Sequence, residues 1–240
     1  MKKIVISQPM YFPWLGIFEQ INFADVFVHY DDVKLPGRGG SSGNFINRVQ
    51  IKTPTGFSWM TVPIKRSGVF INEELIDETK NWKIDHKNTI KHNYARAPFG
   101  KDAAGLFLSV LDADYRNLAE LNIRSIEACC DYMGLKTEFI RSSTLGIPGK
   151  SSERLLNIIK YLGGDKYITG HGAKNYLDFE LFERNNIDVE FMDYKVLPWP
   201  QLWRDFNPYV SILDLIANTG SNAINYFKSG TVFWREFLKR

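Results

Sequence analysis

Side chains that can exchange protons follow an apolar run near the amino terminus of the 240-residue chain. Asp31 and Asp32 come directly after this run, at residues 26–30. A carboxylate that faces a cleft can take a proton from an amine, hold a sugar hydroxyl or cap a turn. Adjacent side chains of an extended chain point to opposite faces, so we expect only one of the two to face the cleft. The pair alone is a weak signal for a metal, and we predict no metal site and no tightly bound cofactor.

Histidine and cysteine supply the other candidates for chemistry. His86 and His92 fall in one expected helix, but their spacing is not that of a helical zinc site. His86 is therefore a candidate acid or base, with a packed histidine as the alternative. His171 lies between two glycines after an expected strand, which suits a reactive group. Cys129 and Cys130 lie within an expected helix, so we rank them low as nucleophiles.

Candidate binding residues gather around the first expected strand and the helix after it. Gln8 ends the strand, and Tyr11, Trp14 and Gly16 follow. A helix start offers free backbone N–H groups to a phosphate, and glycine permits close approach of the backbone. The alternative is that Gln8, Tyr11 and Trp14 only pack and cap a turn.

Three further residues are predicted to contact a ligand. Tyr30 ends the second expected strand, at the same sheet edge as Gln8. Asn47 and Arg48 follow a glycine-rich segment at 34–44 that lacks the ending of a phosphate-binding loop. The planar guanidinium of arginine binds phosphate or carboxylate in two places at once, so we favour Arg48 as an anchor. A surface salt bridge is the alternative.

The elements that must position these residues begin with a βαβ unit. The apolar run at 4–7 predicts a buried strand, the apolar spacing over 14–23 predicts an amphipathic helix, and 26–30 predicts a second, parallel strand. In a Rossmann-like sheet, ligands lie beyond the carboxyl ends of the strands. The loop at 8–14 would lie there.

The remaining pattern predicts one α/β domain over 1–240. It has a Rossmann-like, mostly parallel sheet that starts with the βαβ unit, and a β-hairpin and helical insert at roughly 45–160. The chain is expected to close with helices at 211–218 and 222–238. Other expected elements are hairpin strands at 45–51 and 57–62, helices at 82–94, 103–111, 118–132 and 176–186, a helix opened by serines at 151 and 152, and strands at 166–169 and 187–192.

Bulk composition excludes several classes of function. The formal net charge is +3, too small for the dense basic face of a nucleic-acid-binding protein. No apolar segment is long enough to cross a membrane, and the apolar run at 4–6 is too short for a signal peptide. The two cysteines include no CxxC pair and suit a reducing compartment. We therefore expect a cytoplasmic protein.

Short motifs follow one another along nearly the whole chain. They are QPMYFPWLG at 8–16, AD at 24–25, YDDV at 30–33, NR at 47–48, Trp82 with His86, YITG at 167–170, YLD at 176–178, PQ at 200–201 and SILDL at 211–215. This ordered set resembles the WbqC-like family. The likeness brings Tyr176 and Gln201 into the set of expected substrate-binding residues. The family pattern has proline where this chain has His171, so the resemblance carries no role to that histidine.

The resemblance implies a role in O-antigen or related polysaccharide biosynthesis. Our leading hypothesis is acyl or aminoacyl transfer to the amino group of a nucleotide-linked amino sugar, from an acyl or aminoacyl donor. The alternatives are a non-catalytic binder of nucleotide sugars and an ATP-dependent amide ligase. The start of the chain is also similar to that of nucleotidyltransferases with an HxGH motif, but Trp14 and Ile17 stand in place of the histidines, which argues against adenylyl transfer.

Overall fold

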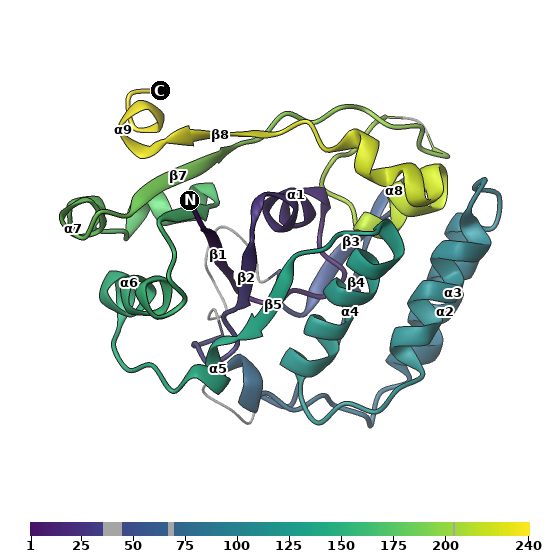
Figure 1. Cartoon of the computed structure of the whole chain (residues 1–240). Helices are drawn as coiled ribbons and strands as arrows, with labels where there is room; N and C mark the ends of the chain where they lie inside the picture. The colour runs from purple at the N-terminus through teal and green to yellow at the C-terminus, as the bar shows by residue number, and fades with distance from the viewer. Residues whose placement is uncertain (36–44, 67–69, 204) are drawn as a thin grey trace.

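A computed structural model of the chain describes residues 1–35, 45–66, 70–203 and 205–240. Most of the glycine-rich segment at 34–44 lies outside these ranges. The described residues form a six-stranded sheet in the order β5-β2-β1-β6-β7-β8, and a separate two-stranded hairpin, β3-β4 (Figure 1). The expected α/β class and mostly parallel Rossmann-like sheet are confirmed.

The βαβ unit forms at the centre of the sheet. Strand β1 spans Lys3–Ser7, helix α1 spans Leu15–Phe23 and strand β2 spans Val26–His29. The two strands pair in parallel, with Ile4 opposite Val26. Pro13 lies one residue before Trp14, the N-cap of α1, and the apolar positions of α1 explain why the helix packs on the sheet.

Strands from the second half of the chain complete the sheet. Strands β5 (Glu138–Arg141), β6 (Lys166–Thr169) and β7 (Asp188–Asp193) run parallel to the central pair. Strand β8 (Gly230–Phe233) pairs with β7 in antiparallel fashion at one edge. The first strand therefore acquires its second neighbour, β6, from a segment far along the chain.

Alternate residues of the strands face two separate cores. Val5 and Phe27 belong to the core on the side of α1, together with helix α4 (Leu118–Met133) and helix α8 (Ile212–Thr219). Ile4 and Val26 face the opposite core, where helices α6 (Ser151–Tyr161), α7 (Phe179–Arg184) and α9 (Trp234–Phe237) pack. The sheet is thus the middle layer of three.

Between β2 and β5 the chain leaves the sheet. It forms the hairpin of β3 (Arg48–Thr53) and β4 (Gly56–Thr61), then helices α2 (Trp82–Tyr94), α3 (Gly100–Leu111) and α4. The long excursion enlarges the core on the α1 side (Figure 1). Short helical turns fill the connections, at η1 (Ile71–Glu73), α5 (Ser142–Leu145), η2 (His171–Asn175) and η3 (Gly220–Tyr226).

The carboxyl-terminal part differs from the sequence prediction. The expected helix at 222–238 is wrong, since the segment forms η3, strand β8 and the short α9. Phe191 and Val232 are partners in the β7–β8 register, so this segment satisfies its backbone by joining the sheet. Helical spacing of apolar residues cannot reveal an open sheet edge elsewhere in the chain. Strand β5 was also not predicted.

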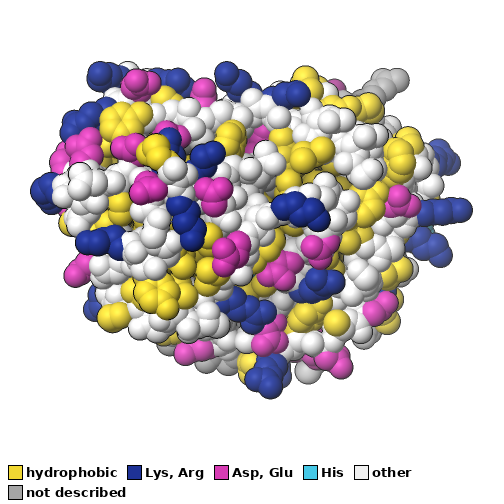
Figure 2. All heavy atoms as spheres, in the orientation of Figure 1, with side chains coloured by type: hydrophobic (Ala, Val, Ile, Leu, Met, Phe, Trp, Pro, Cys, Tyr) yellow, Lys and Arg dark blue, Asp and Glu magenta, His cyan; other side chains and the backbone are white. Residues whose placement is uncertain are grey.

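The surface carries charges of both signs. Figure 2 shows Lys and Arg side chains interspersed with Asp and Glu on the face it displays, with apolar side chains between them. None of the described helices is long and apolar enough to cross a membrane.

Candidate functional site

A cavity of about 610 Å³ lies at the carboxyl ends of β1 and β6. These neighbouring strands mark the point where the chain order of the sheet reverses, since β2 lies on one side of β1 and β6 on the other. Open α/β sheets bind ligands at such a switch point. The residues that line it include Ser7, Gln8, Met10, Ile17, Gln20, Tyr30, Val33, Ser151, Leu155, Tyr167, Thr169, Gly170, Gly172, Ala173 and Tyr176.

The start of helix α6 forms one wall of this cavity. Ser151 opens the helix and lines the cavity, and its φ of 49° is unusual for a residue other than glycine. The preceding residue, Lys150, makes no side-chain hydrogen bond to the helix start. Backbone N–H groups at a helix start suit an anion. Strain of this kind is often found at functional sites.

The Asp31 carboxylate is hydrogen-bonded to a neighbouring turn. Its side chain is 3% exposed, and its Oδ1 accepts a hydrogen bond from the backbone N–H of Ser143 at 3.0 Å. Its Oδ2 accepts from the Ser143 hydroxyl at 2.7 Å. The carboxylate therefore fixes the start of α5 to the end of β2. Neither Asp31 nor Asp32 is among the described residues that line the cavity.

Asp32 is bound by groups from two other elements. Its Oδ1 lies 2.5 Å from the Ser142 hydroxyl, and its Oδ2 lies 2.5 Å from Nη2 of Arg154. The Arg154 guanidinium also lies 5.1 Å from the ring centre of Tyr30, which lines the cavity. The two aspartates do not point to opposite faces as expected, because the chain bends after Asp31 and the Ser142 hydroxyl lies within reach of both.

His171 lies next to the cavity but is not one of the described residues that line it. Its Nε2 lies 2.7 Å from the carbonyl oxygen of Met192, and a carbonyl oxygen only accepts, so Nε2 donates this hydrogen bond. The imidazole packs 5.0 Å from the ring of Tyr194, whose hydroxyl accepts a hydrogen bond from Gln20 at 2.9 Å. Gln20 and both glycines that flank His171 line the cavity.

Tyr11, His86 and Asn47 lie in the interior, away from this cavity. The Tyr11 hydroxyl lies 3.1 Å from Nδ1 of His86, and the two side chains are 0% and 5% exposed. Burial lowers the pKa of His86 to about 4, so the ring is neutral at pH 7. Asn47 donates to the carbonyl oxygen of Val62 at 2.8 Å and holds the hairpin. This placement favours packing roles for all three.

Trp14, Gly16 and Gln201 have other surroundings. A Cβ on Gly16 would lie 2.3 Å from the Trp14 indole, so this glycine makes room for a side chain of the protein itself. Trp14 lines a second pocket together with Arg48. Gln201 donates to Asp214 at 2.9 Å and bonds the backbone of Asn207 in both directions, which fixes a loop.

The described residues contain no cluster of His, Cys, Asp and Glu that could hold a metal ion. Cys129 and Cys130 are both 0% exposed, and burial raises the pKa of each thiol far above its usual value. A thiol that stays protonated is a poor nucleophile. Both cysteines therefore act as packing residues of α4.

Similarity to known proteins identifies the family of this chain. The model of the WbqC-like protein family matches residues 8–226. The chain belongs to the WbqC-like protein family. It is 37% identical over 233 residues to the uncharacterized protein Rv1507c of Mycobacterium tuberculosis, covering 95% of this chain and 98% of the relative. No solved structure matches the chain. Membership of the family suggests a role in polysaccharide or O-antigen biosynthesis.

The structure of this WbqC-like chain brings three predicted residues together on the cavity, which are Gln8, Tyr30 and Tyr176. Sequence reasoning did not single out Ser151 or Gln20 for the site. The serines at 151 and 152 predict a helix start, and a helix start between two strands of a parallel sheet is the signal that could have indicated the site.

Proposed function

We propose that this WbqC-like protein modifies a nucleotide-linked amino sugar by transferring an acyl or aminoacyl group to its amine. The observation that carries the proposal is the cavity at the switch point, with the start of α6 on one wall. Its volume of about 610 Å³ is in the range of small-molecule sites, and its lining mixes apolar groups with a few polar ones, as such sites do.

The cavity offers complementary groups for each part of this ligand. The backbone N–H groups of the first turn of α6, which begins at Ser151, suit the diphosphate. The Gln8 amide and the hydroxyls of Tyr30 and Tyr176 can both donate and accept hydrogen bonds, as sugar hydroxyls require. Tyr30 is further held by the neighbouring Arg154 guanidinium, which adds positive charge near the same wall.

In the proposed step, the amine nitrogen of the sugar attacks the carbonyl carbon of an acyl thioester or acyl phosphate. A C–N bond forms, the bond from that carbon to the thiolate or phosphate leaving group breaks, and the nitrogen gives up one proton. His171 accepts the proton at Nδ1, because its Nε2 is already bonded to Met192. Of the other three predicted catalytic residues, Asp31 and Asp32 are held by hydrogen bonds from serines and Arg154, and His86 is buried. His171 is therefore the residue that we assign to this step.

Calorimetry with dTDP-, UDP- and GDP-linked amino sugars tests the binding part of the proposal. The wild-type protein is expected to bind at least one of them, and His171→Asn is expected to keep that affinity. The rate of transfer from an acyl donor should fall by about 10²–10⁴-fold in His171→Asn, because a general base usually accelerates a reaction by that factor. The matched control is His92→Asn, an exposed histidine on α2 that should leave transfer unchanged.

Two outcomes would overturn this form of the function. Binding of none of the sugars would exclude the cavity as their site. Binding of ATP with release of pyrophosphate, and no acyl transfer, would instead indicate a ligase.

A non-catalytic sugar-nucleotide binder is the second candidate. It is favoured by the absence of carboxylate, imidazole and thiol groups among the described residues that line the cavity. It predicts that sugar-nucleotide affinity survives in His171→Asn and Asp32→Asn while no donor yields an acylated product.

A further inference from the structure

A second pocket, of about 400 Å³, adjoins the switch-point cavity. Met10, in the loop that follows β1, lines both and therefore lies between the two spaces. The second pocket is otherwise built from the start of α1, the hairpin and the segment before α8. Its lining comprises Met10, Pro13, Trp14, Phe45, Arg48, Val49, Gln50 and Tyr209.

The walls of this pocket are mostly apolar and aromatic. Trp14 packs 5.7 Å from the ring of Tyr209 and 5.1 Å from that of Tyr194, which fixes the indole plane. Gln50 accepts a hydrogen bond from Asn207 at 3.1 Å, so its amide oxygen is already engaged. Few polar groups of the pocket remain that could form hydrogen bonds with a nucleotide base or a sugar. A pocket of this kind suits an aliphatic chain.

Arg48 is the cation of the pocket. Its guanidinium lies 4.4 Å from the ring centre of Trp59, and its buried Nε has no hydrogen-bond partner among the described residues. The ion pairs found in the described ranges do not include Arg48. A partly buried cation without a carboxylate partner is suited to an anion supplied by a ligand.

We propose that this pocket holds the acyl chain of the donor, with an anionic group of the donor against Arg48. The ligand class is an apolar chain attached to a phosphate or carboxylate, as in acyl phosphates and phosphate-bearing acyl thioesters. This inference rests on the proposed function, because it gives the acyl donor a place next to the acceptor sugar. The shared residue Met10 marks where the acyl carbon would pass from one space to the other.

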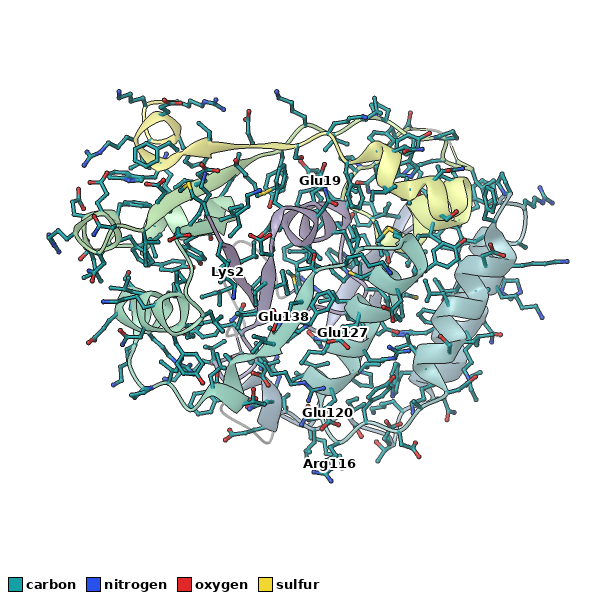
Figure 3. The ribbon with its side chains drawn as sticks, in the orientation of Figure 1. Lys2, Glu19, Arg116, Glu120, Glu127 and Glu138 are labelled. Atoms are coloured by element: carbon teal, nitrogen blue, oxygen red, sulfur yellow. The ribbon has the colours of Figure 1, made fainter. Side chains whose placement is uncertain are left out.

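Octyl phosphate is the probe, since it carries an aliphatic chain and an anion but cannot react as a donor. Calorimetry below its micelle-forming concentration is expected to show binding at least tenfold tighter than that of n-octanol or inorganic phosphate. Arg48→Gln and Tyr209→Ala are each expected to weaken it at least fivefold. Tyr209 is 64% exposed, so we expect the Tyr209→Ala variant to keep the fold. Arg116→Gln, an exposed arginine before α4, is the control and should bind as the wild type does (Figure 3).

The same variants distinguish failure of this inference from failure of the proposed function. Octyl phosphate that binds no better than phosphate, or binds Arg48→Gln and Tyr209→Ala as well as wild type, overturns the donor pocket. Binding only above the micelle-forming concentration overturns it too, because it would be surface adsorption. Sugar-nucleotide affinity is measured separately. Its absence alongside tight, Arg48-dependent binding of octyl phosphate would overturn the sugar-modifying function while the apolar anion site stands.

Discussion

The Asp32 carboxylate lies 2.5 Å from Nη2 of Arg154, and this ion pair joins the end of β2 to the first turn of α6. The two side chains are 23% and 11% exposed, so water screens the pair only in part. Because α6 begins at the cavity wall, the pair also holds the helix start in place for the proposed ligand.

Loss of this pair is expected to destabilise the protein. Asp32→Asn should lower the free energy of unfolding by about 1–3 kcal/mol, between the values for exposed and buried pairs. Urea denaturation measures it. The control is Glu183→Gln, which breaks the exposed Arg235–Glu183 pair and should cost less. If Asp32→Asn instead abolished acyl transfer without loss of stability, Asp32 rather than His171 would be the proton acceptor.

Asp214 is expected to make stability depend on pH. Burial raises its pKa to about 6, against the opposing hydrogen bonds from Trp199 and Gln201. The folded protein then holds this proton more tightly than the unfolded chain, so the contribution of Asp214 to stability falls as the pH rises from about 4 to about 6. His86, whose pKa is lowered from 6.5 to about 4, acts in the opposite direction over the same range.

The Asp214→Asn variant separates the two effects. Its amide oxygen can still accept both hydrogen bonds, but it cannot ionise. The free energy of unfolding of the variant, relative to wild type, should rise by up to about 3 kcal/mol between pH 4 and pH 7. Denaturation at these two pH values measures the change, with the exposed Asp188→Asn as control. An equal difference at both values would mean that Asp214 titrates normally.

Gly16 should tolerate no side chain. In Gly16→Ala the new Cβ would meet the Trp14 indole, so we expect a loss of about 1–3 kcal/mol from overpacking, with weaker binding of octyl phosphate. Gly105→Ala is the matched control, because its Cβ would meet nothing within 4 Å in the middle of α3. That variant should gain about 0.5–1 kcal/mol from helix propensity. Equal effects of the two changes would contradict the role of Gly16.

The buried thiols should be inert in the folded protein. Cys129 and Cys130 are fully buried and keep their protons. A thiol-reactive dye is expected to label neither cysteine in native buffer and both in denaturant. Labelling at a rate faster than global unfolding would show that α4 opens locally.

The sequence predicted the centre of the sheet better than its edges. The strands at 4–7 and 26–30 and the helix between them form a local unit, so their pattern carries the information. Strands β5 and β8 are edge strands whose pairing depends on distant partners. The expected helix at 222–238 failed for that reason.

The candidate site was predictable to a similar degree. Gln8 and Tyr30 follow directly from strand ends, and the structure places both on the cavity. Tyr11 lies in the same predicted loop but faces the interior, next to Phe12 with its φ of 40°. The backbone conformation of such a turn determines the direction of the neighbouring side chains. The spacing of apolar residues in the sequence does not predict that conformation. The pairing of Asp32 with Arg154 spans 122 residues and was likewise out of reach.

The pairing of β1 with β6 has a consequence for how the molecule is made. Ile4 lies beside Tyr167 in that register, so β1 has one side without its sheet partner until β6, which lies much later in the chain, has been synthesised. The β1–β2 pair and α1 can dock early, whereas sheet closure needs a contact between segments far apart in the chain. Contacts of this separation slow folding and leave strand edges exposed to other chains meanwhile. We therefore expect this protein to fold in two stages. The β1–α1–β2 unit docks first, and β1 pairs with β6 only afterwards.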